Sequence, residues 1–295
     1  MIDKLEMLIA LARERHFGRA AETCHVTQPT LSSAIKSLED QLGVQLVQRG
    51  ARFIGLTPEG ERVLARAKSI VAEARALKSD VAVAREGLSG TLRLGVIPTA
   101  LASVHDLTRP FLDSHPGVRL RIPSLNSHLI VEKLTEFEID AGLSYASADL
   151  PADRLPGYTT MPLYEESYAL VTRKHPDLPA SMAWADVAGF ELGLLTPDMQ
   201  NRRIIDRNLK RAGVAVTPRL ESNSIIGLVS HVTEHHSATI LPSRTAVFYA
   251  TGRDLVCIPL TGGVSGIADV ALLLPPLGRR TLLLDAFIES IAQGL

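Results

Sequence analysis

The sequence predicts an α/β protein in which a small all-α region is joined by one long helix to a larger region of alternating strands and helices. Three observations predict this fold class. Apolar residues recur at helical spacing through residue 42, good helix formers run without a break over 58–87, and short β-branched segments alternate with helical ones from residue 91. Such alternation is typical of βαβ units with a parallel sheet.

The first 24 residues are expected to form two short helices. The apolar face of the first consists of Leu5, Leu8, Ile9 and Leu11. Phe17 is placed in the connection, and Arg19–Glu22 begins the second helix, where Ala20 and Ala21 permit a close helix crossing. This pair offers a packing surface to a third helix.

The third helix is predicted over 28–42, with one buried face and one polar face. Thr27 is a suitable N-cap, Pro29 is tolerated in the first turn, and Gly43 ends the helix. The apolar face repeats at spacings of four, three and four through Leu31, Ile35, Leu38 and Leu42. The residues of this helix that could contact DNA bases or phosphates are Thr27, Gln28, Pro29, Thr30, Ser32, Ser33 and Lys36. An ordinary amphipathic helix with a solvated polar face would show the same pattern, so its surroundings decide between the two.

A two-strand wing is expected after the third helix, over 46–53, with Gly50 at its tip. Arg49 and Arg52 would then project toward a phosphate backbone or a narrow minor groove. Two helices, a polar third helix and a basic wing together predict a winged helix-turn-helix that binds DNA.

Over its full length the chain resembles the LysR-type transcriptional regulators. The motifs that stand at the spacing of that family are Phe17 with Ala20-Ala21, Thr27-Gln28-Pro29-Thr30-Leu31-Ser32, Ile35 through Leu38-Glu39, Leu42-Gly43, Leu46, Arg49 and Leu56-Thr57-Pro58-Glu59-Gly60. The resemblance implies a winged helix-turn-helix, a long dimerising helix and a two-lobed effector domain like a periplasmic binding protein, which tunes transcription.

The helix after Pro58 carries a narrow apolar stripe. Its members, at alternating spacings of four and three, are Val63, Ala67, Ile70, Ala74, Leu77 and Val81. A helix of this length with such a stripe needs a partner, so we interpret it as the dimerisation helix; packing on its own domain is the alternative.

Charge alone does not predict nucleic acid as a partner. The chain has a formal net charge of −1, and residues 1–88 hold 13 Lys and Arg against 11 Asp and Glu. Phosphate binding must therefore come from individually placed cations and helix N-termini, and affinity should fall as salt rises.

Cys24 and Cys257 lie far apart in the sequence, so a structural disulfide is not expected and a reducing cytoplasm is the simple interpretation. A thiol redox switch is the alternative. No export signal and no apolar run long enough to span a bilayer is recognised, so a cytoplasmic protein without a membrane partner is expected.

From residue 88 onward two α/β lobes are expected, lobe I at about 91–160 and 268–295 and lobe II at about 161–267, with crossing strands near 160–162 and 263–266 and a cleft between the lobes. The preceding domains are 1–58 for DNA binding and 59–87 for dimerisation. Ligands in such sheets bind beyond the carboxyl ends of strands. The candidate effector-binding residues at these places are Pro98, Thr99, Ala100, Asn126, Ser127, His128, Ser144, Tyr145, Thr196, Met199, Arg202, Asn223 and Ser224. Helix capping is the alternative for each single residue at these places, Thr99 and Ser127 included, and it is the preferred interpretation of Asp198.

Two segments, 97–101 and 194–206, look most like LysR-type regulators associated with formate dehydrogenase operons. That resemblance implies a very small carboxylate effector such as formate, for which Arg202 or Arg203 and a few hydroxyls would suffice.

One segment departs from the family pattern. The turn before Ile240 usually contains glycines, whereas here it is Thr233-Glu-His-His-Ser237. His231 and His235 stand four apart with His236 adjacent, so a metal-responsive regulator is an alternative, although no cysteine and no nearby carboxylate beyond Glu234 completes a site. We therefore expect no metal and no cofactor.

Two other classes of protein fit poorly. An enzyme would need a nucleophile elbow, a phosphate loop or a dinucleotide fingerprint, and none of these motifs occurs. A small-molecule-binding protein without a DNA role would leave the first 87 residues unexplained. The expected function is a transcriptional regulator, a homodimer or homotetramer that binds double-stranded promoter DNA and a small organic anion, with RNA polymerase left open as a further partner.

Overall fold

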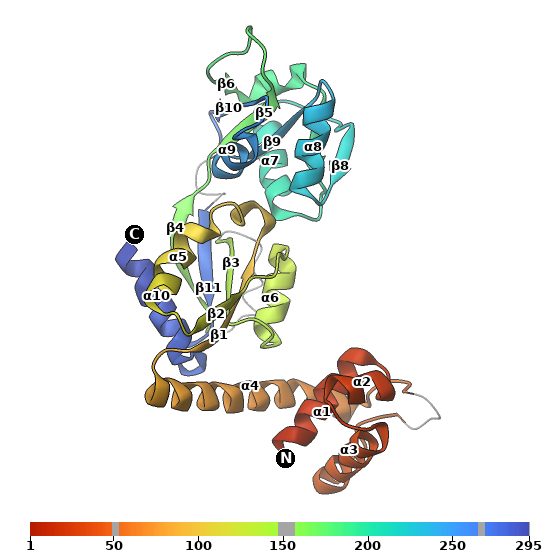
Figure 1. The fold of residues 1–295 in the computed structure, drawn as a ribbon. Helices are drawn as coiled ribbons and strands as arrows, with labels where there is room; N and C mark the ends of the chain where they lie inside the picture. The colour runs from red at the N-terminus through yellow and green to blue at the C-terminus, as the bar shows by residue number, and fades with distance from the viewer. Residues whose placement is uncertain (49–52, 147–156, 265–268, 295) are drawn as a thin grey trace. The chain divides into compact units, whose positions relative to one another are not determined.

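The computed structural model describes residues 1–48, 53–146, 157–264 and 269–294. The chain forms two units, Met1–Gly87 and Leu88–Leu295, which we call unit 1 and unit 2. Figure 1 draws unit 1 in red to orange and the rest of the chain in yellow to blue. The expected fold class is confirmed: a helical N-terminal unit is followed by an α/β unit.

Unit 1 is built from four helices. They are α1 (Ile2–Glu14), α2 (Phe17–Thr23), α3 (Gln28–Leu42) and α4 (Pro58–Glu86). The third helix begins and ends as predicted, because the Thr27 hydroxyl accepts a hydrogen bond from the Thr30 N–H at 3.4 Å and Gly43 adopts φ 69°. Leu31 and Leu38 are fully buried against α1 and α2. Leu42, which was expected on the same face, is 41% exposed because it lies in the last turn, beyond that core.

The connection before α2 is shorter than expected. Phe17 was placed in it but is the first residue of α2. The Nδ1 atom of His16 accepts hydrogen bonds from the N–H groups of Gly18 at 3.1 Å and Arg19 at 3.3 Å. The imidazole therefore caps the helix two residues earlier than the expected start at Arg19.

The two sides of the wing are held by the end of α3. Val47 pairs with Leu56 in an antiparallel bridge. The carboxylate of Glu39 accepts hydrogen bonds from the N–H groups of Leu46 at 2.7 Å and Val47 at 3.1 Å. The predicted tip, with Arg49 and Arg52, lies outside the described residues.

The apolar stripe of α4 divides into two parts. Ala67 is buried in the core of unit 1, where α4 packs on α1, so this part of the stripe follows the alternative of packing on its own domain. Further along the helix, Ile70, Leu77 and Val81 are 47%, 66% and 52% exposed. The second part therefore has no apolar partner within the described residues of unit 1, and we call Ile70, Ala74, Leu77 and Val81 the α4 stripe.

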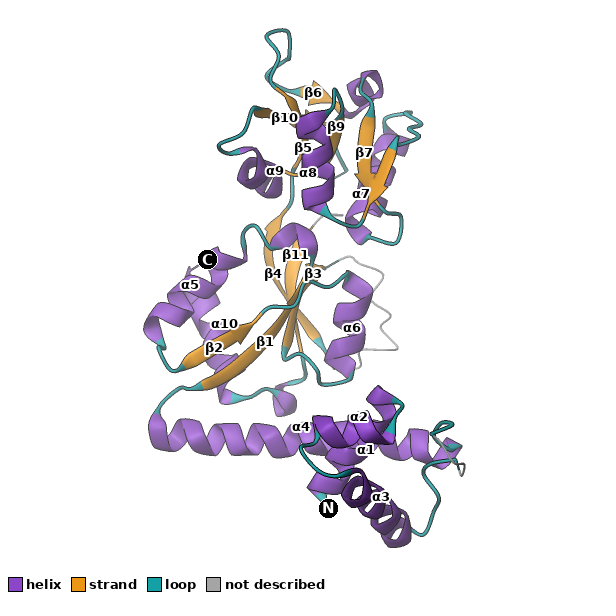
Figure 2. Ribbon diagram, turned by 45° about the vertical axis from the view of Figure 1, so that its right-hand side comes forward, coloured by secondary structure: helices purple, strands orange, loops and turns teal. Residues whose placement is uncertain are grey.

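Unit 2 contains two sheets, each with helices packed against it (Figure 2). The sheet of lobe I has the order β2-β1-β3-β11-β4. Its strands are β1 (Gly90–Val96), β2 (Val118–Arg121), β3 (Ala141–Tyr145), β4 (Thr159–Glu165) and β11 (Asp269–Leu274). Its helices are η1 (Pro98–Ala100), α5 (Val104–Ser114), α6 (Ser127–Thr135), η3 (Leu277–Arg279) and α10 (Leu282–Gly294).

The sheet of lobe II has the order β6-β10-β5-β9-β7-β8. Its strands are β5 (Tyr168–Arg173), β6 (Met182–Ala183), β7 (Leu192–Leu195), β8 (Leu220–Ser222), β9 (Ala238–Pro242) and β10 (Leu255–Thr261). Its helices are η2 (Trp184–Gly189), α7 (Gln200–Arg211), α8 (Ile225–Glu234) and α9 (Ser243–Ala250).

Both sheets are mixed, whereas the strand–helix alternation predicted parallel ones. In lobe I, β11 is antiparallel to β3 and β4; in lobe II, β5 is antiparallel to β9 and β10. The antiparallel strands β5 and β11 each follow a crossing between the lobes, so each enters its sheet from the other lobe. The strand β10 was not predicted, because Pro259 interrupts an apolar run that otherwise suits a strand.

The first crossing lies at Glu166 and Ser167. The strand β4 pairs with β11 through Glu165, so lobe I extends past the expected limit at residue 160. The return crossing was expected at 263–266, and residues 265–268 lie outside the described part of the chain. Among the described residues, no helix is long and apolar enough to cross a membrane.

Candidate functional site

The polar face of α3 is open to solvent. Its seven predicted contact residues, all exposed, are Thr27, Gln28, Pro29, Thr30, Ser32, Ser33 and Lys36. The hydroxyls of Thr27 and Thr30 lie 2.8 Å apart and share a hydrogen bond, so both also belong to the cap of the helix. The face thus presents short side chains and an amide at the N-terminal end of a helix, where free N–H groups favour phosphate, with the cation of Lys36 further along the same helix.

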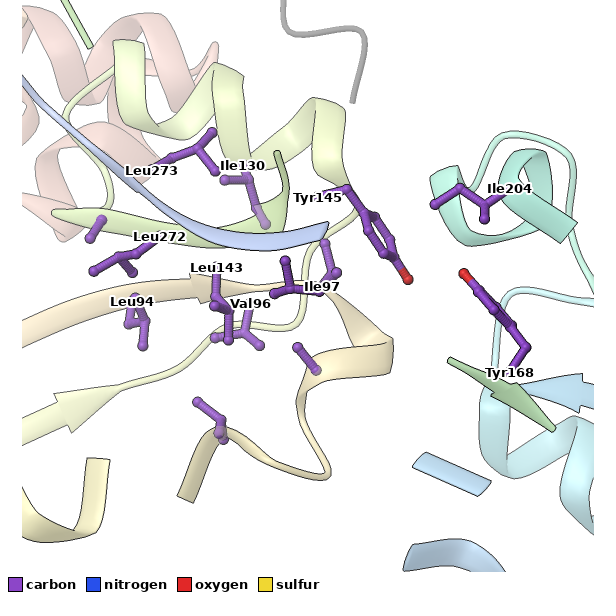
Figure 3. Close-up of a cluster of buried hydrophobic side chains, with 14 of the residues drawn as sticks. Leu94, Val96, Ile97, Ile130, Leu143, Tyr145, Tyr168, Ile204, Leu272 and Leu273 are labelled. Atoms are coloured by element: carbon purple, nitrogen blue, oxygen red, sulfur yellow. The ribbon is translucent and has the colours of Figure 1, made fainter. Parts of the chain in front are cut away.

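A second candidate site joins the lobes of unit 2. The hydroxyl of Tyr145, at the end of β3, donates a hydrogen bond to the carboxyl of Glu166 at 2.7 Å. The Nδ2 group of Asn201, on α7, donates to the hydroxyls of Tyr145 at 2.9 Å and Tyr168 at 3.1 Å. Figure 3 shows the two tyrosine rings directed toward each other from the two lobes. The hydroxyl of Thr99 completes this inter-lobe network, 3.1 Å from that of Tyr145.

The backbone of η1 is also tied to lobe II. The hydroxyl of Thr245, on α9, donates to the carbonyl oxygen of Thr99 at 2.5 Å. At the crossing itself, the hydroxyls of Ser167 and Ser243 lie 2.9 Å apart. The two lobes therefore meet through polar contacts at the carboxyl ends of β1 and β3, which is where the sequence placed Thr99 and Tyr145.

Glu166 is the acidic member of the inter-lobe network. Burial raises the pKa of its carboxyl to about 8. The hydrogen bond from Tyr145 and the charge of Arg244 both lower this pKa, but burial has the larger effect. The carboxyl is therefore mostly protonated at pH 7. Burial likewise raises the pKa of Tyr145 and Tyr168 well above the ordinary value, so both hydroxyls are neutral.

Several predicted effector residues serve as helix caps. The side chain of Asn126 accepts from the Leu129 N–H at 2.9 Å, and that of Ser224 accepts from the Gly227 N–H at 3.3 Å. His128 and Asn223 are exposed. The alternative of capping therefore describes the hydrogen bonds of Asn126 and Ser224.

Others are buried. Met199 packs in the apolar core of lobe II, and Ala100 is fully buried behind Pro98 in η1. The buried hydroxyls of Ser127, Ser144 and Thr196 have no hydrogen-bond partner within the described residues. Such groups normally bind protein or water, so these hydroxyls are open to another ligand.

Arg202 differs most from its expected role. Its guanidinium pairs with Asp206 at 2.8 Å and Glu221 at 2.7 Å and donates to the Leu195 carbonyl oxygen at 2.7 Å. Two carboxylates already neutralise it, so it fastens α7 to β7 and β8. Arg203 is exposed and bonds the carbonyl oxygens of Pro197 and Asp198 at 3.4 and 3.5 Å.

Glu166, Tyr168 and Asn201 were not among the predicted site residues. Two features of the sequence could have pointed to them. Asn201 lies in the segment 194–206, which the resemblance to formate-associated regulators had already selected, and Glu166 follows a strand. Neither signal indicates that the two side chains meet Tyr145.

The cysteines and histidines were the candidates for a thiol switch and a metal site. Cys24 and Cys257 are both free, in different units, and burial raises the pKa of each thiol. The rings of His231 and His235 stack with centroids 4.5 Å apart. In the described part of the chain, no group of three or more potential metal ligands is found.

Two family models match the chain: "Bacterial regulatory helix-turn-helix protein, lysR family" at residues 2–61 and "LysR substrate binding domain" at residues 85–295. A hydrogen peroxide-inducible genes activator of Dickeya chrysanthemi is 30% identical over 259 residues, which are 87% of this chain and 83% of the relative.

Solved structures share the fold. A variant of full-length OxyR from Pseudomonas aeruginosa matches with a TM-score of 0.72 and 25% identity, covering 100% of this chain and 94% of the other. Full-length CbnR in complex with its target DNA matches with a TM-score of 0.71 and 22% identity over 100% of both chains.

Proposed function

Because the chain belongs to the LysR family of DNA-binding transcriptional regulators, we propose that it binds promoter DNA as a homodimer or a pair of dimers, and that a small molecule held between the lobes of unit 2 changes this binding. Family membership also makes it a regulator and not an enzyme. Promoter binding would place it in the cytoplasm.

The exposed polar face of α3 carries the proposal for DNA. Gln28 can pair bidentately with an adenine edge in the major groove, while Lys36 can neutralise a phosphate. Leu31, Ile35 and Leu38 hold the helix against the rest of unit 1, so the polar face is presented on a rigid support.

Replacing Gln28 with Ala is expected to relax sequence preference, whereas replacing Lys36 with Ala should weaken binding to every sequence. Loss of a bidentate contact costs about 1–3 kcal/mol of discrimination, and loss of a phosphate contact lowers the salt slope by about one. Fluorescence anisotropy on the sequence that the wild-type protein selects from a random pool, and on single-base variants of it, measures both effects.

The control for these variants is Gln41→Ala, an exposed change near the far end of the same helix. It should bind like the wild type. Unchanged affinity and base preference in Gln28→Ala would show that α3 does not read bases through this side chain.

The proposed effector is bound reversibly and is not a peroxide that oxidises the protein. The relative from Dickeya chrysanthemi is named for hydrogen peroxide induction. In this chain Cys257 is the single cysteine of unit 2, and its raised pKa disfavours the thiolate that peroxide would attack. A cysteine pair within unit 2 is therefore excluded by composition.

Hydrogen peroxide is expected to leave operator binding unchanged. The measurement compares the affinity of reduced, peroxide-treated and dithiothreitol-restored protein for the selected DNA, with Cys257→Ser alongside. A reversible change on oxidation in the wild type that disappears in Cys257→Ser would instead establish a thiol sensor in lobe II.

The expected formate effector has little to support it. The names of the relatives reported above do not mention formate, and Arg202, which was to bind it, is already paired with Asp206 and Glu221. A metal effector would need more ligands than His231 and His235 provide within the described residues. The chemistry of the inter-lobe network is a better guide to the effector.

A further inference from the structure

Glu166 is a buried acid that forms no ion pair within the described residues. It lies in the crossing between β4 and β5 and is 8% exposed. Among the described residues no Lys, Arg or His forms an ion pair with it. The charge of Arg244 lowers the pKa of Glu166, but the guanidinium makes its contacts elsewhere. It stacks 4.5 Å from the centre of the Tyr164 ring and lies 3.9 Å from Asp106. A carboxyl in such a place is costly unless something else pairs with it.

Asn201 provides a second, independent observation that points to a ligand. Its side chain is 3% exposed, and its Nδ2 group is used by Tyr145 and Tyr168. Its Oδ1 atom is buried and has no hydrogen-bond partner within the described residues. A buried acceptor without a donor is destabilising. The Nδ2 group of Asn201 and the carboxyl of Glu166 both bind the hydroxyl of Tyr145, so the amide that carries this acceptor and the acid lie on either side of one hydroxyl.

We propose that the small molecule bound between the lobes carries a protonated amine, and that Glu166 and the Oδ1 atom of Asn201 select it over a carboxylate. This proposal rests on the proposed function, in which the ligand lies between the lobes. An ammonium group offers three N–H donors and a positive charge. It would satisfy both acceptors at once, whereas a carboxylate would add acceptors beside them.

The other groups around Glu166 are compatible with an amine. Tyr145 from β3, Tyr168 from β5 and Tyr164 from β4 are neutral, and the opposing charges of Arg244 on α9 and Asp106 on α5 are close to each other. The ammonium would therefore be the one new charge beside the acid. Pairing would turn the neutral acid into a carboxylate, so one proton leaves Glu166 for solvent as the amine binds.

The proton release gives the proposal a pH signature. The pKa of Glu166 in the free protein is about 8, so binding an ammonium below that pH requires deprotonation. Affinity for an amine should rise about tenfold for each pH unit between 6 and 7.5 and level off above 8. A neutral or anionic ligand that leaves the acid protonated would not show this rise.

The test measures thermal unfolding of the full chain with two size-matched pairs of probes, methylamine against formate and ethanolamine against acetate, at fixed ionic strength. Wild type, Glu166→Gln and the control Glu165→Gln, an exposed neighbour, are compared. We expect saturable stabilisation by at least one amine in the wild type and the control, and at least tenfold weaker binding in Glu166→Gln. The glutamine keeps a hydrogen-bond acceptor for Tyr145, so a merely structural carboxyl would be replaced without loss.

Stabilisation by a carboxylate alone, by none of the probes, or equally in wild type and Glu166→Gln would overturn the proposal. If Glu166→Gln does not fold, the pH dependence of amine binding to the wild type decides, and a flat profile would also overturn it. Operator affinity is measured with each bound probe. An amine that binds with the expected pH dependence but leaves operator affinity unchanged would refute the proposed modulation and support the amine site. A carboxylate that binds and alters operator affinity would support the modulation and refute the amine site.

Discussion

Replacing Leu77 with Glu is expected to turn the protein into a monomer and to weaken operator binding by roughly a hundredfold or more, since two linked DNA contacts exceed one by about 10²–10⁴ in affinity. Leu77 lies at the centre of the exposed α4 stripe, between Ala74 and Val81. A charge there would have to be buried without a partner when two copies associate. Sedimentation velocity measures the association, and fluorescence anisotropy the affinity.

The matched control is Ala65→Glu, which places the same charge on an exposed position of α4 away from the stripe. It should remain associated and bind DNA as the wild type does. If Leu77→Glu sediments like the control, the α4 stripe is not the dimer interface, and another surface must hold the two DNA-binding domains together.

The Gly60→Ala variant should lose about 3 kcal/mol of stability in unit 1. A Cβ atom at position 60 would lie 2.1 Å from the carbonyl oxygen of Leu46, a backbone atom. That backbone cannot move freely, because the Leu46 N–H is bound by Glu39 at 2.7 Å and its carbonyl oxygen accepts from the Thr57 N–H at 2.9 Å. The clash between the added Cβ atom and the Leu46 carbonyl oxygen would therefore push the wing away from the start of α4.

Thermal unfolding of the full chain, followed by circular dichroism, measures the loss, and operator affinity should fall with it. The control is Gly55→Ala in the same hairpin, where the nearest contact for a Cβ is the Gln48 side chain at an ordinary 3.8 Å. Unfolding of Gly60→Ala at the wild-type temperature would mean that the hairpin and α4 are packed differently.

Local patterns were sufficient for most of unit 1. The apolar spacing of α3 and its flanking Thr27 and Gly43 depend on contacts within a few residues, so they can be identified in the sequence. The early start of α2 was missed because an imidazole is an uncommon cap, although His16 is also local. The division of the stripe on α4 was not predictable, since it depends on where α1 crosses.

The site in unit 2 was only partly accessible to sequence reasoning. Thr99 and Tyr145 stand at the ends of strands, and that position is visible in the strand–helix alternation. Arg202 looked available for a ligand because its partner Glu221 comes from β8, and only the pairing of β7 with β8 brings that carboxylate to α7.

The sequence by itself determined the family, the helix-turn-helix with its polar reading face, and the succession of strands and helices in unit 2, because each follows from residue types at short, regular spacing. Only the tertiary structure decided which strands are antiparallel, which part of the α4 stripe is exposed, and that Glu166 and Asn201 meet at the hydroxyl of Tyr145. These features depend on contacts between residues far apart in the sequence, such as the 21 positions between Tyr145 and Glu166 and the 56 between Tyr145 and Asn201. Pattern along the chain carries no information about such contacts.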